Sequence, residues 1–187
     1  MTQPLSPAER HELILRARRA GEKALGLPAR GGDPPAAAGR LAEPGAAFVT
    51  WKRDGRLRGC IGSVEPHRVL AADVESNAVA ALLHDPRFPP ATPKEFPRYR
   101  VEISVLSPFE AVADPSTIVI GAHGLYIEKG RRRGLLLPQV PVEWGWDVPT
   151  FLAQLCLKAG LPERAWEEGA PAVSLFRFGA EVFGEGV

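Results

Sequence analysis

The chain of 187 residues is long enough to bury one sizeable core and too short for several independent domains. Hydrophobic residues make up 45% and charged residues 24%, which excludes wholesale disorder and fibrous architectures. Lys and Arg total 23 against 22 Asp and Glu, so a net charge of +1 offers no basic surface for non-specific nucleic-acid binding, and we do not expect nucleic acid as a partner.

The sequence also predicts where the protein works. No apolar run approaches the roughly 18 residues of a membrane span, and charged residues interrupt the N-terminal segment where a signal peptide needs its apolar stretch. The two cysteines, Cys60 and Cys156, make a poor disulfide framework, and free thiols suit a reducing compartment. We therefore expect a cytoplasmic protein with no membrane association.

The N-terminal segment predicts a helix over residues 6–25. Ser6, Pro7 and Glu9 supply a capping hydroxyl, a proline for the first turn and a glutamate three residues after the cap. Apolar residues recur behind them at helical spacing, and the cations of the same helix should point mostly away from the core: Arg16, Arg18, Arg19 and Lys23. Residues 27–44 are rich in Gly, Ala and Pro without a hydrophobic period, which predicts a flexible surface loop.

A hairpin, a helix and a strand should follow. The β-prone runs 47–51 and 56–61 flank Asp54-Gly55, a dipeptide suited to tight hairpin turns, so we expect them to pair antiparallel. A second helix is predicted over residues 69–84. Residues 100–106 alternate apolar and polar side chains, as a half-buried strand does, and Glu102 should face solvent or a cleft.

The rest of the chain predicts a meander, a helix and a last strand. Three short β-prone runs occupy residues 118–120, 125–128 and 135–137. Asp147 can cap a helix that Gly160 ends, and a helical turn near residues 163–166 should precede a strand over residues 176–183. Because the strands come in hairpins rather than in βαβ alternation, we predict a single domain of the α+β class, with a largely antiparallel sheet and helices packed on one face.

Motifs that would fix a reaction are missing. The sequence contains no phosphate-binding GxxxxGKS or GxxxxGKT, no GxGxxG, no HExxH, no GxSxG and no CxxC. Two cysteines and four histidines, scattered along the chain, offer no zinc-type spacing, so we predict no metal site and assign no cofactor. The chain also lacks the three closely spaced cysteines that hold the iron–sulfur cluster of a radical enzyme.

The strongest candidate site is the turn Leu57-Arg58-Gly59-Cys60-Ile61-Gly62. A thiol lies between two glycines, where backbone amides can approach a ligand, and opposite charge and oriented amides lower a cysteine pKa. Cys60 is therefore a candidate nucleophile, and Arg58 a candidate for stabilising anionic charge if the strand is regular through Gly59. The alternative is a small apolar cysteine at a tight strand end. We assign Gly59 and Gly62 as candidate ligand-contacting residues.

Three other residues could transfer protons. His123 lies between small residues at a strand junction and could act as a general base, although such a histidine is often only a turn residue. Glu102 and Glu143 could be paired carboxylates, but no pattern brings them together. We keep His123 and Glu102 as catalytic candidates beside Cys60 and Arg58.

Two polar residues after the Cys60 turn are further candidates for ligand contact. Asn77 is the only asparagine and lies among small residues on the predicted second helix, where a structural tie to the neighbouring backbone is favoured over direct chemistry, because a buried amide needs partners. Arg87 follows Asp85 in a turn and could contact a ligand or form a local ion pair. Cys156 lies on an apolar helix stripe, and we expect it in the core.

Seven blocks of the sequence, in order over roughly residues 46–183, resemble the AMMECR-type domain family. The family signature is similar to Leu57-Arg58-Gly59-Cys60-Ile61-Gly62. The other blocks that carry the resemblance are Asn77–Ala81, Asp85–Phe88, Glu102–Leu106, Gly121–Leu125, Arg133–Val140 and Cys156–Pro162. The resemblance implies an α+β fold with a larger lobe formed from both chain ends and a smaller lobe from the middle.

The resemblance implies a kind of pathway for this protein, but it does not imply a specific reaction. Bacterial and archaeal relatives are associated by gene fusion or neighbourhood with Memo-like proteins and radical S-adenosylmethionine enzymes, which become candidate partners. We expect a component of a small-molecule or protein modification pathway with a site centred on Cys60 and a small-molecule or peptide ligand. The competing hypothesis is a non-catalytic adaptor or regulatory module in which the same blocks build the core.

Overall fold

The computed structural model describes residues 4–28 and 32–185, which form two compact units. Unit 1 contains residues 4–106 and 181–185, and unit 2 contains residues 107–180. Both chain ends thus contribute to the larger unit and the middle forms the smaller one, which confirms the predicted α+β class and its two lobes. None of the helices within the described ranges is long and apolar enough to cross a membrane.

Unit 1 contains two long helices and a four-stranded antiparallel sheet. Its elements are α1 (Pro7–Ala24), the 3-10 turn η1 (Gly39–Ala42), β1 (Pro44–Gly45), β2 (Ala47–Arg53), β3 (Arg56–Gly62), β4 (Arg68–Val69), α2 (Leu70–Leu83), the 3-10 turn η2 (Phe96–Arg98), β5 (Tyr99–Leu106) and β10 (Ala180–Gly184). The sheet order is β10-β5-β2-β3, and β1 pairs separately with β4. The hairpin turn uses left-handed backbone at Asp54 (φ 52°) and Gly55 (φ 75°), as the dipeptide predicted.

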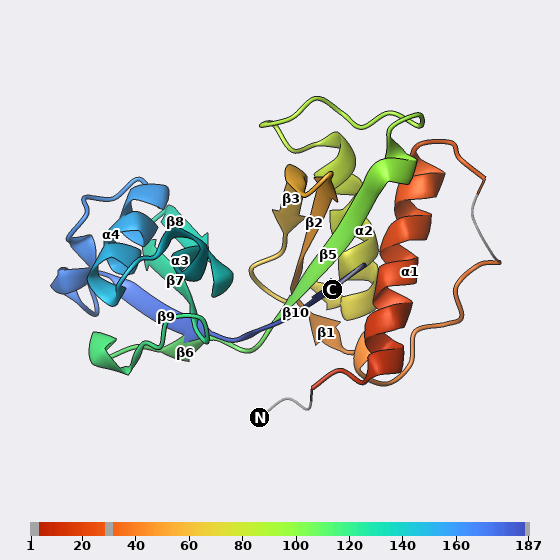
Figure 1. Ribbon diagram of the computed structural model, residues 1–187. Coiled ribbons are helices and arrows are strands. Elements are labelled where there is room, and N and C mark those ends of the chain that lie inside the picture. The colour runs from red at the N-terminus through yellow and green to blue at the C-terminus, as the bar shows by residue number, and fades with distance from the viewer. Residues whose placement is uncertain (1–3, 29–31, 186–187) are drawn as a thin grey trace. The chain divides into compact units, whose positions relative to one another are not determined.

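Helices α1 and α2 pack together on one face of this sheet (Figure 1). Alternation along the strands turns Val49, Trp51 and Ile103 toward the helices, where each is fully buried. The Trp51 indole N–H also donates to the carbonyl of Ala78 on α2, at 2.9 Å. The buried apolar face therefore lies under the helices, and the opposite face carries polar side chains such as Thr50 and Glu102 together with Phe48.

Helix α1 begins as predicted, but its arginines are not all turned away from the body. Ser6 and Glu9 form the predicted capping box. Arg16 is only 6% exposed, because its guanidinium pairs with glutamates of both α1 and α2. Arg18 places its guanidinium carbon 5.3 Å from the Trp51 ring centroid. The prediction that these two cations point away was wrong, since long side chains can bury their stems and still satisfy the charged group.

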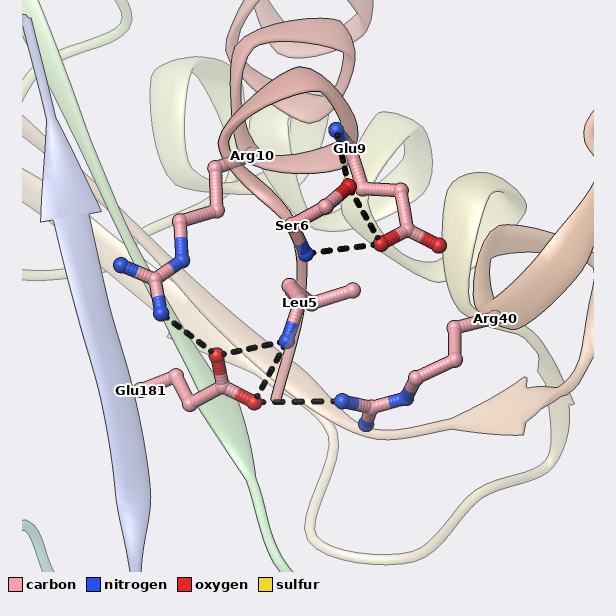
Figure 2. A network of polar contacts seen from close by, with 6 residues as sticks. All are labelled: Leu5, Ser6, Glu9, Arg10, Arg40 and Glu181. Atoms are coloured by element: carbon pink, nitrogen blue, oxygen red, sulfur yellow. Dashed lines mark hydrogen bonds and ion pairs between the residues drawn. The ribbon is translucent and has the colours of Figure 1, made fainter. Parts of the chain in front are cut away.

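The segment predicted as a loose loop is anchored to the unit. Residues 29–31 lie outside the described residues, but Leu41 in η1 is 1% exposed and belongs to the core. Glu181 of β10 accepts hydrogen bonds from Arg40 (3.1 Å), Arg10 (3.0 Å) and the Leu5 amide (3.0 Å), as Figure 2 shows. One carboxylate thus joins the last strand to the N-terminal helix and to η1.

Unit 2 is a smaller antiparallel sheet with two helices. Its elements are β6 (Glu110–Ala111), the 3-10 turn η3 (Pro115–Thr117), β7 (Gly124–Lys129), β8 (Arg132–Leu136), α3 (Gln139–Trp144), α4 (Val148–Lys158), the 3-10 turn η4 (Ala165–Glu168) and β9 (Ser174–Phe178). The strand order is β6-β9-β7-β8. Asp147 caps α4 through the Thr150 amide, as predicted, and Phe151, Leu155 and Cys156 are fully buried against the sheet.

The second half of the chain differs from the prediction in three places. Residues 118–120 form no strand, because Ile118 only ends η3 and the chain turns at Gly121. Helix α3 was not predicted. The strand expected over residues 176–183 is two strands, β9 and β10, which break near Gly179 and belong to the sheets of different units. Apolar residues on both sides of the break made the run look continuous.

Candidate functional site

The register of the unit 1 sheet aligns Cys60 with two polar residues on neighbouring strands. Cys60 of β3 lies opposite Thr50 of β2, and Thr50 lies opposite Glu102 of β5. Because Trp51 on the next position faces the helices, these three side chains project from the other face of the sheet. We call the set Cys60, Thr50 and Glu102 the Cys60 row.

Cys60 is half-buried and has contacts on its side chain and on both backbone groups. The Thr50 hydroxyl donates to Cys60 Sγ at 3.1 Å. The Cys60 N–H donates to Asp85 Oδ2 at 2.8 Å, and its carbonyl accepts from Arg87 Nη2 at 3.3 Å. Both backbone groups therefore point away from β2, so Cys60 and Thr50 form a non-hydrogen-bonded pair with Cα atoms about 4.5 Å apart. That close pairing explains the short distance between hydroxyl and thiol.

Asp85 and Arg87 form a clasp over the outer edge of β3. Asp85 is 4% exposed and accepts from Arg87 Nη2 at 2.7 Å and Nε at 3.0 Å. The pKa of Asp85 is lowered from 3.8 to about 2, chiefly by this side-chain bond from Arg87, with a smaller contribution from the Cys60 amide and against the opposing effect of burial. The carboxylate is thus charged at neutral pH. The clasp satisfies backbone groups at Cys60 that an edge strand would otherwise expose to another chain.

Other residues of the protein occupy the space beside the two glycines of the signature. A Cβ added at Gly59 would lie 1.8 Å from the carbonyl oxygen of Ala81 on α2, and one at Gly62 would lie 2.3 Å from the Phe48 ring. Helix α2 therefore makes the close backbone approach that the sequence suggested for a ligand at Gly59. The assignment of Gly59 and Gly62 to ligand contact remains a prediction.

Arg58 does not lie along the Cys60 row. Trp51 pairs with Gly59 and Lys52 with Leu57, so Arg58 is the extra residue of a β-bulge. Its Nε lies 3.3 Å from the buried Tyr99 hydroxyl, and its guanidinium carbon lies 5.8 Å from the Phe88 ring centroid. The regular strand that the sequence argument required is absent. Arg87 is instead the cation that contacts Cys60.

Glu102 shares the face of Cys60, as its alternation predicted, but not its immediate surroundings. Neighbouring strands lie about 4.8 Å apart, so two strand spacings separate Glu102 and Cys60 by about 10 Å. Lys52, two residues along β2 from Thr50, forms an ion pair with Glu102 at an Nζ–Oε2 distance of 2.9 Å. Lys52 therefore holds the Glu102 carboxylate in place at the far end of the row.

The other two titratable candidates belong to unit 2. His123 Nδ1 accepts a hydrogen bond from the Val119 amide at 3.0 Å, so the ring is held by its own turn. Burial lowers the pKa of His123, and Arg177 lowers it further against the attraction of Glu110. The imidazole is thus neutral near pH 7. Glu143 lies exposed on α3, in a different unit from Glu102.

Asn77 lies in a buried polar cluster between α2 and the start of β2. Its amide donates to the Ala47 carbonyl at 3.0 Å, to Asp73 Oδ2 at 3.0 Å and to the Ser63 hydroxyl at 3.2 Å. Asp73, with no exposed surface, also accepts from the Ala47 amide. These bonds tie the helix to the strand, which is the structural alternative weighed for Asn77. Its assignment to ligand contact remains a prediction.

Sequence reasoning missed Thr50, Lys52 and the contact from Asp85. Counting outward from the hairpin turn without a bulge would place Gly59 opposite Thr50, and only the extra residue at Arg58 brings Cys60 there. No sequence signal predicted that shift. Within residues 4–28 and 32–185 no group of three His, Cys, Asp or Glu side chains could hold a metal ion.

Comparisons with known proteins agree on one family. The family model described as AMMECR1 matches residues 16–183. Protein MJ0810 of Methanocaldococcus jannaschii is 50% identical over 138 residues, which cover 71% of this chain and 68% of that protein. Protein PYRAB00100 of Pyrococcus abyssi is 41% identical over 183 residues, covering 92% and 88%. The crystal structure of the uncharacterized protein PH0010 from Pyrococcus horikoshii superposes with a TM-score of 0.84 and 40% identity, covering 93% of this chain and 90% of that one.

Proposed function

This chain belongs to the AMMECR1 family, and we propose that its functional site is the Cys60 row, acting on a small-molecule or peptide ligand in a modification pathway. The observation that carries the proposal is a half-buried thiol that receives a hydroxyl hydrogen bond on the sheet face opposite the helices. A thiol in that setting can meet a ligand, whereas a core cysteine cannot. Memo-like and radical S-adenosylmethionine proteins remain the candidate partners by association.

Each residue of the row has a distinct role in this proposal. Cys60 is the reactive or ligand-contacting thiol, and the donated hydrogen bond from Thr50 stabilises its thiolate form. Arg87 supplies the positive charge beside it. Glu102 is too far to take the thiol proton directly, so it would exchange a proton with the ligand lying along the row. Arg58 and His123 remain weaker candidates, because the bulge directs one toward Phe88 and the other belongs to unit 2.

A non-catalytic adaptor is the second candidate, and the packing of the signature favours it. Gly59 fits against α2, Gly62 fits under Phe48, and the Asp85–Arg87 clasp satisfies the backbone of Cys60. Each of these contacts builds the edge of the sheet without a ligand. The reactivity of the thiol therefore decides between the two functions.

Native-state alkylation tests the proposal. Cys156 has no exposed surface, and burial raises the pKa of its thiol, so both access and ionisation are suppressed. We expect iodoacetamide near neutral pH to modify Cys60 at least about tenfold faster than Cys156 in the folded protein. Peptide mass mapping against denatured protein gives both rates, and Cys60→Ser gives the background at Cys156. Equal protection of the two thiols until unfolding would favour the adaptor.

Serine substitutions at the two cysteines should change the free energy of unfolding by different amounts. Cys60→Ser should change the free energy of unfolding by less than about 1 kcal/mol, because the site is half-exposed and Thr50 can still donate to the new hydroxyl. Cys156→Ser places a hydroxyl in an apolar core and should cost about 1–3 kcal/mol. Urea denaturation of both variants measures the difference. A larger loss at Cys60 than at Cys156 would assign Cys60 to the core of unit 1.

A further inference from the structure

Unit 2 exposes a stacked pair of tryptophans that the proposed site does not use. Trp144, at the end of α3, is 70% exposed, the largest fraction of any large hydrophobic side chain in the described residues. Its ring lies 6.1 Å from that of Trp146, with 19° between the planes, and Trp146 is half-buried and packs against the core. The inner indole is thus anchored, and the outer one presents a broad apolar face to solvent.

The end of α3 holds this pair in place. Gly145 adopts left-handed backbone (φ 65°), the Trp146 amide donates to the Pro141 carbonyl at 2.8 Å, and the Gly145 amide donates to that of Val142 at 3.3 Å. These two bonds form a Schellman motif, which reverses the chain at a helix end. The reversal explains why residues two positions apart stack on one side, so the tryptophan pair is built into the fold.

A second apolar surface belongs to the same helix. Val142 is 58% exposed and Val119 is 54% exposed. The Cβ position of Gly121 lies 3.2 Å from Val142 Cγ2, so the turn of residues 119–123 touches α3. Exposed apolar side chains mark interaction surfaces when they are contiguous, and tryptophan is enriched among the residues that dominate binding. Val142 and Trp144 are two positions apart on α3 and do not share a face, so the contiguous apolar surface is the tryptophan pair.

Two carboxylates, neither of them in an ion pair with a described residue, are adjacent to the tryptophans in sequence. Glu143 is exposed and forms no hydrogen bond or ion pair with any residue of the described ranges. Asp147 is also exposed, and hydrogen bonds from the Thr150 side chain and amide lower its pKa, so it is ionised at neutral pH. Two carboxylates and an open indole face are complementary to a cationic side chain, which can lie over the ring while its charge faces an acid.

We propose that Trp144, Trp146, Glu143 and Asp147 form a docking surface for a basic segment of a partner protein, in which an arginine or lysine side chain covers Trp144. We call this set the tryptophan ledge. The proposal is independent of the chemistry at Cys60, because every residue of the ledge belongs to unit 2. It predicts a binding site that recognises positive charge and an extended aliphatic stem together.

The test uses an acetylated hexapeptide that alternates arginine and glycine, with matched peptides in which glutamine or glutamate replaces arginine. Binding to the full chain is measured by calorimetry and by tryptophan fluorescence at two salt concentrations. We expect the arginine peptide to bind in a salt-sensitive manner, Trp144→Ala to weaken it at least about fivefold, and Glu143→Gln to weaken it about twofold to threefold. Leu157→Ala, which removes another exposed apolar side chain of unit 2, should leave the affinity unchanged.

Several results would overturn the proposal. One is an arginine peptide that does not bind at millimolar concentration, and another is equal binding of the glutamine or glutamate peptide. A third is Trp144→Ala binding as tightly as the original chain while its thermal unfolding is unchanged. A dimer that dissociates on Trp144→Ala would assign the ledge to self-association instead.

Discussion

Replacing Gly59 with alanine should reduce the stability of the protein more than any other small substitution in the signature. The new Cβ would lie 1.8 Å from the carbonyl oxygen of Ala81, a backbone atom of α2 that no side-chain rotation can move. Either the helix or β3 must shift, and the core between them loses its packing. We expect a loss of more than about 3 kcal/mol in the free energy of unfolding, or failure to fold.

Two other glycines provide the controls for this prediction. Gly32→Ala should be neutral to within about 0.5 kcal/mol, because the structure leaves open space around that position. The loss of stability in Gly62→Ala should lie between those of Gly32→Ala and Gly59→Ala, because the new Cβ would clash with the Phe48 ring, a side chain that can move. Urea denaturation and soluble yield measure all three variants. A Gly59→Ala protein as stable as Gly32→Ala would mean that α2 does not pack against β3 as described.

Replacing Asp85 with asparagine should cost about 2–3 kcal/mol near neutral pH. The variant removes the charged acceptor that binds Arg87 and the Cys60 amide at a carboxylate only 4% exposed, whereas the exposed Arg87 side chain can return to water. The loss should come without a change in the fold, because asparagine has the same shape. Urea denaturation of Asp85→Asn measures it, and Asp33→Asn, at an exposed carboxylate, is the control.

The same substitution should change the response to acid in a defined direction. The folded protein lowers the pKa of Asp85 from 3.8 to about 2, so its contribution is complete above the unfolded value and disappears as the pH falls toward 2. That shift corresponds to about 2 kcal/mol. The difference in unfolding free energy between the original chain and Asp85→Asn should therefore shrink from neutral pH to about pH 2. A difference that stays constant with pH would contradict the ion pair as its source.

Helix caps and turn residues in the sequence correctly predicted where two helices begin and where the β2–β3 hairpin turns. Ser6 and Asp147 cap helices that begin within one residue of the predicted position, and Asp54-Gly55 supplies the left-handed turn of the β2–β3 hairpin. Such features depend on neighbours in the chain. The prediction for residues 176–183 was wrong because it depended on contacts with distant parts of the chain. Alternation shows that a strand has a buried face, but not which sheet the strand joins. The chain breaks near Gly179, and β9 and β10 join different sheets.

The candidate site was predictable in its residues but not in its arrangement. Cys60 and Glu102 could be selected because thiols and carboxylates carry chemistry, yet their common row depends on strand register. The bulge at Arg58 sets that register and turns the predicted cation away. The contact of Asp85 with the Cys60 amide joins residues 25 positions apart, and only the packing of α2 beside β3 brings them together. No periodicity in the sequence encodes such a contact.

The division of unit 1 between both ends of the chain has a consequence for biosynthesis. A ribosome delivers residues in order, so unit 2, which is continuous, can complete its core as soon as residue 180 has emerged. Unit 1 must wait for β10, whose Glu181 binds Arg10 and Arg40, and for Glu185, which pairs with Arg18. Until then the outer edge of β5 is open to pairing with another nascent chain. The larger unit therefore reaches its native state last, although most of its residues are made before those of unit 2.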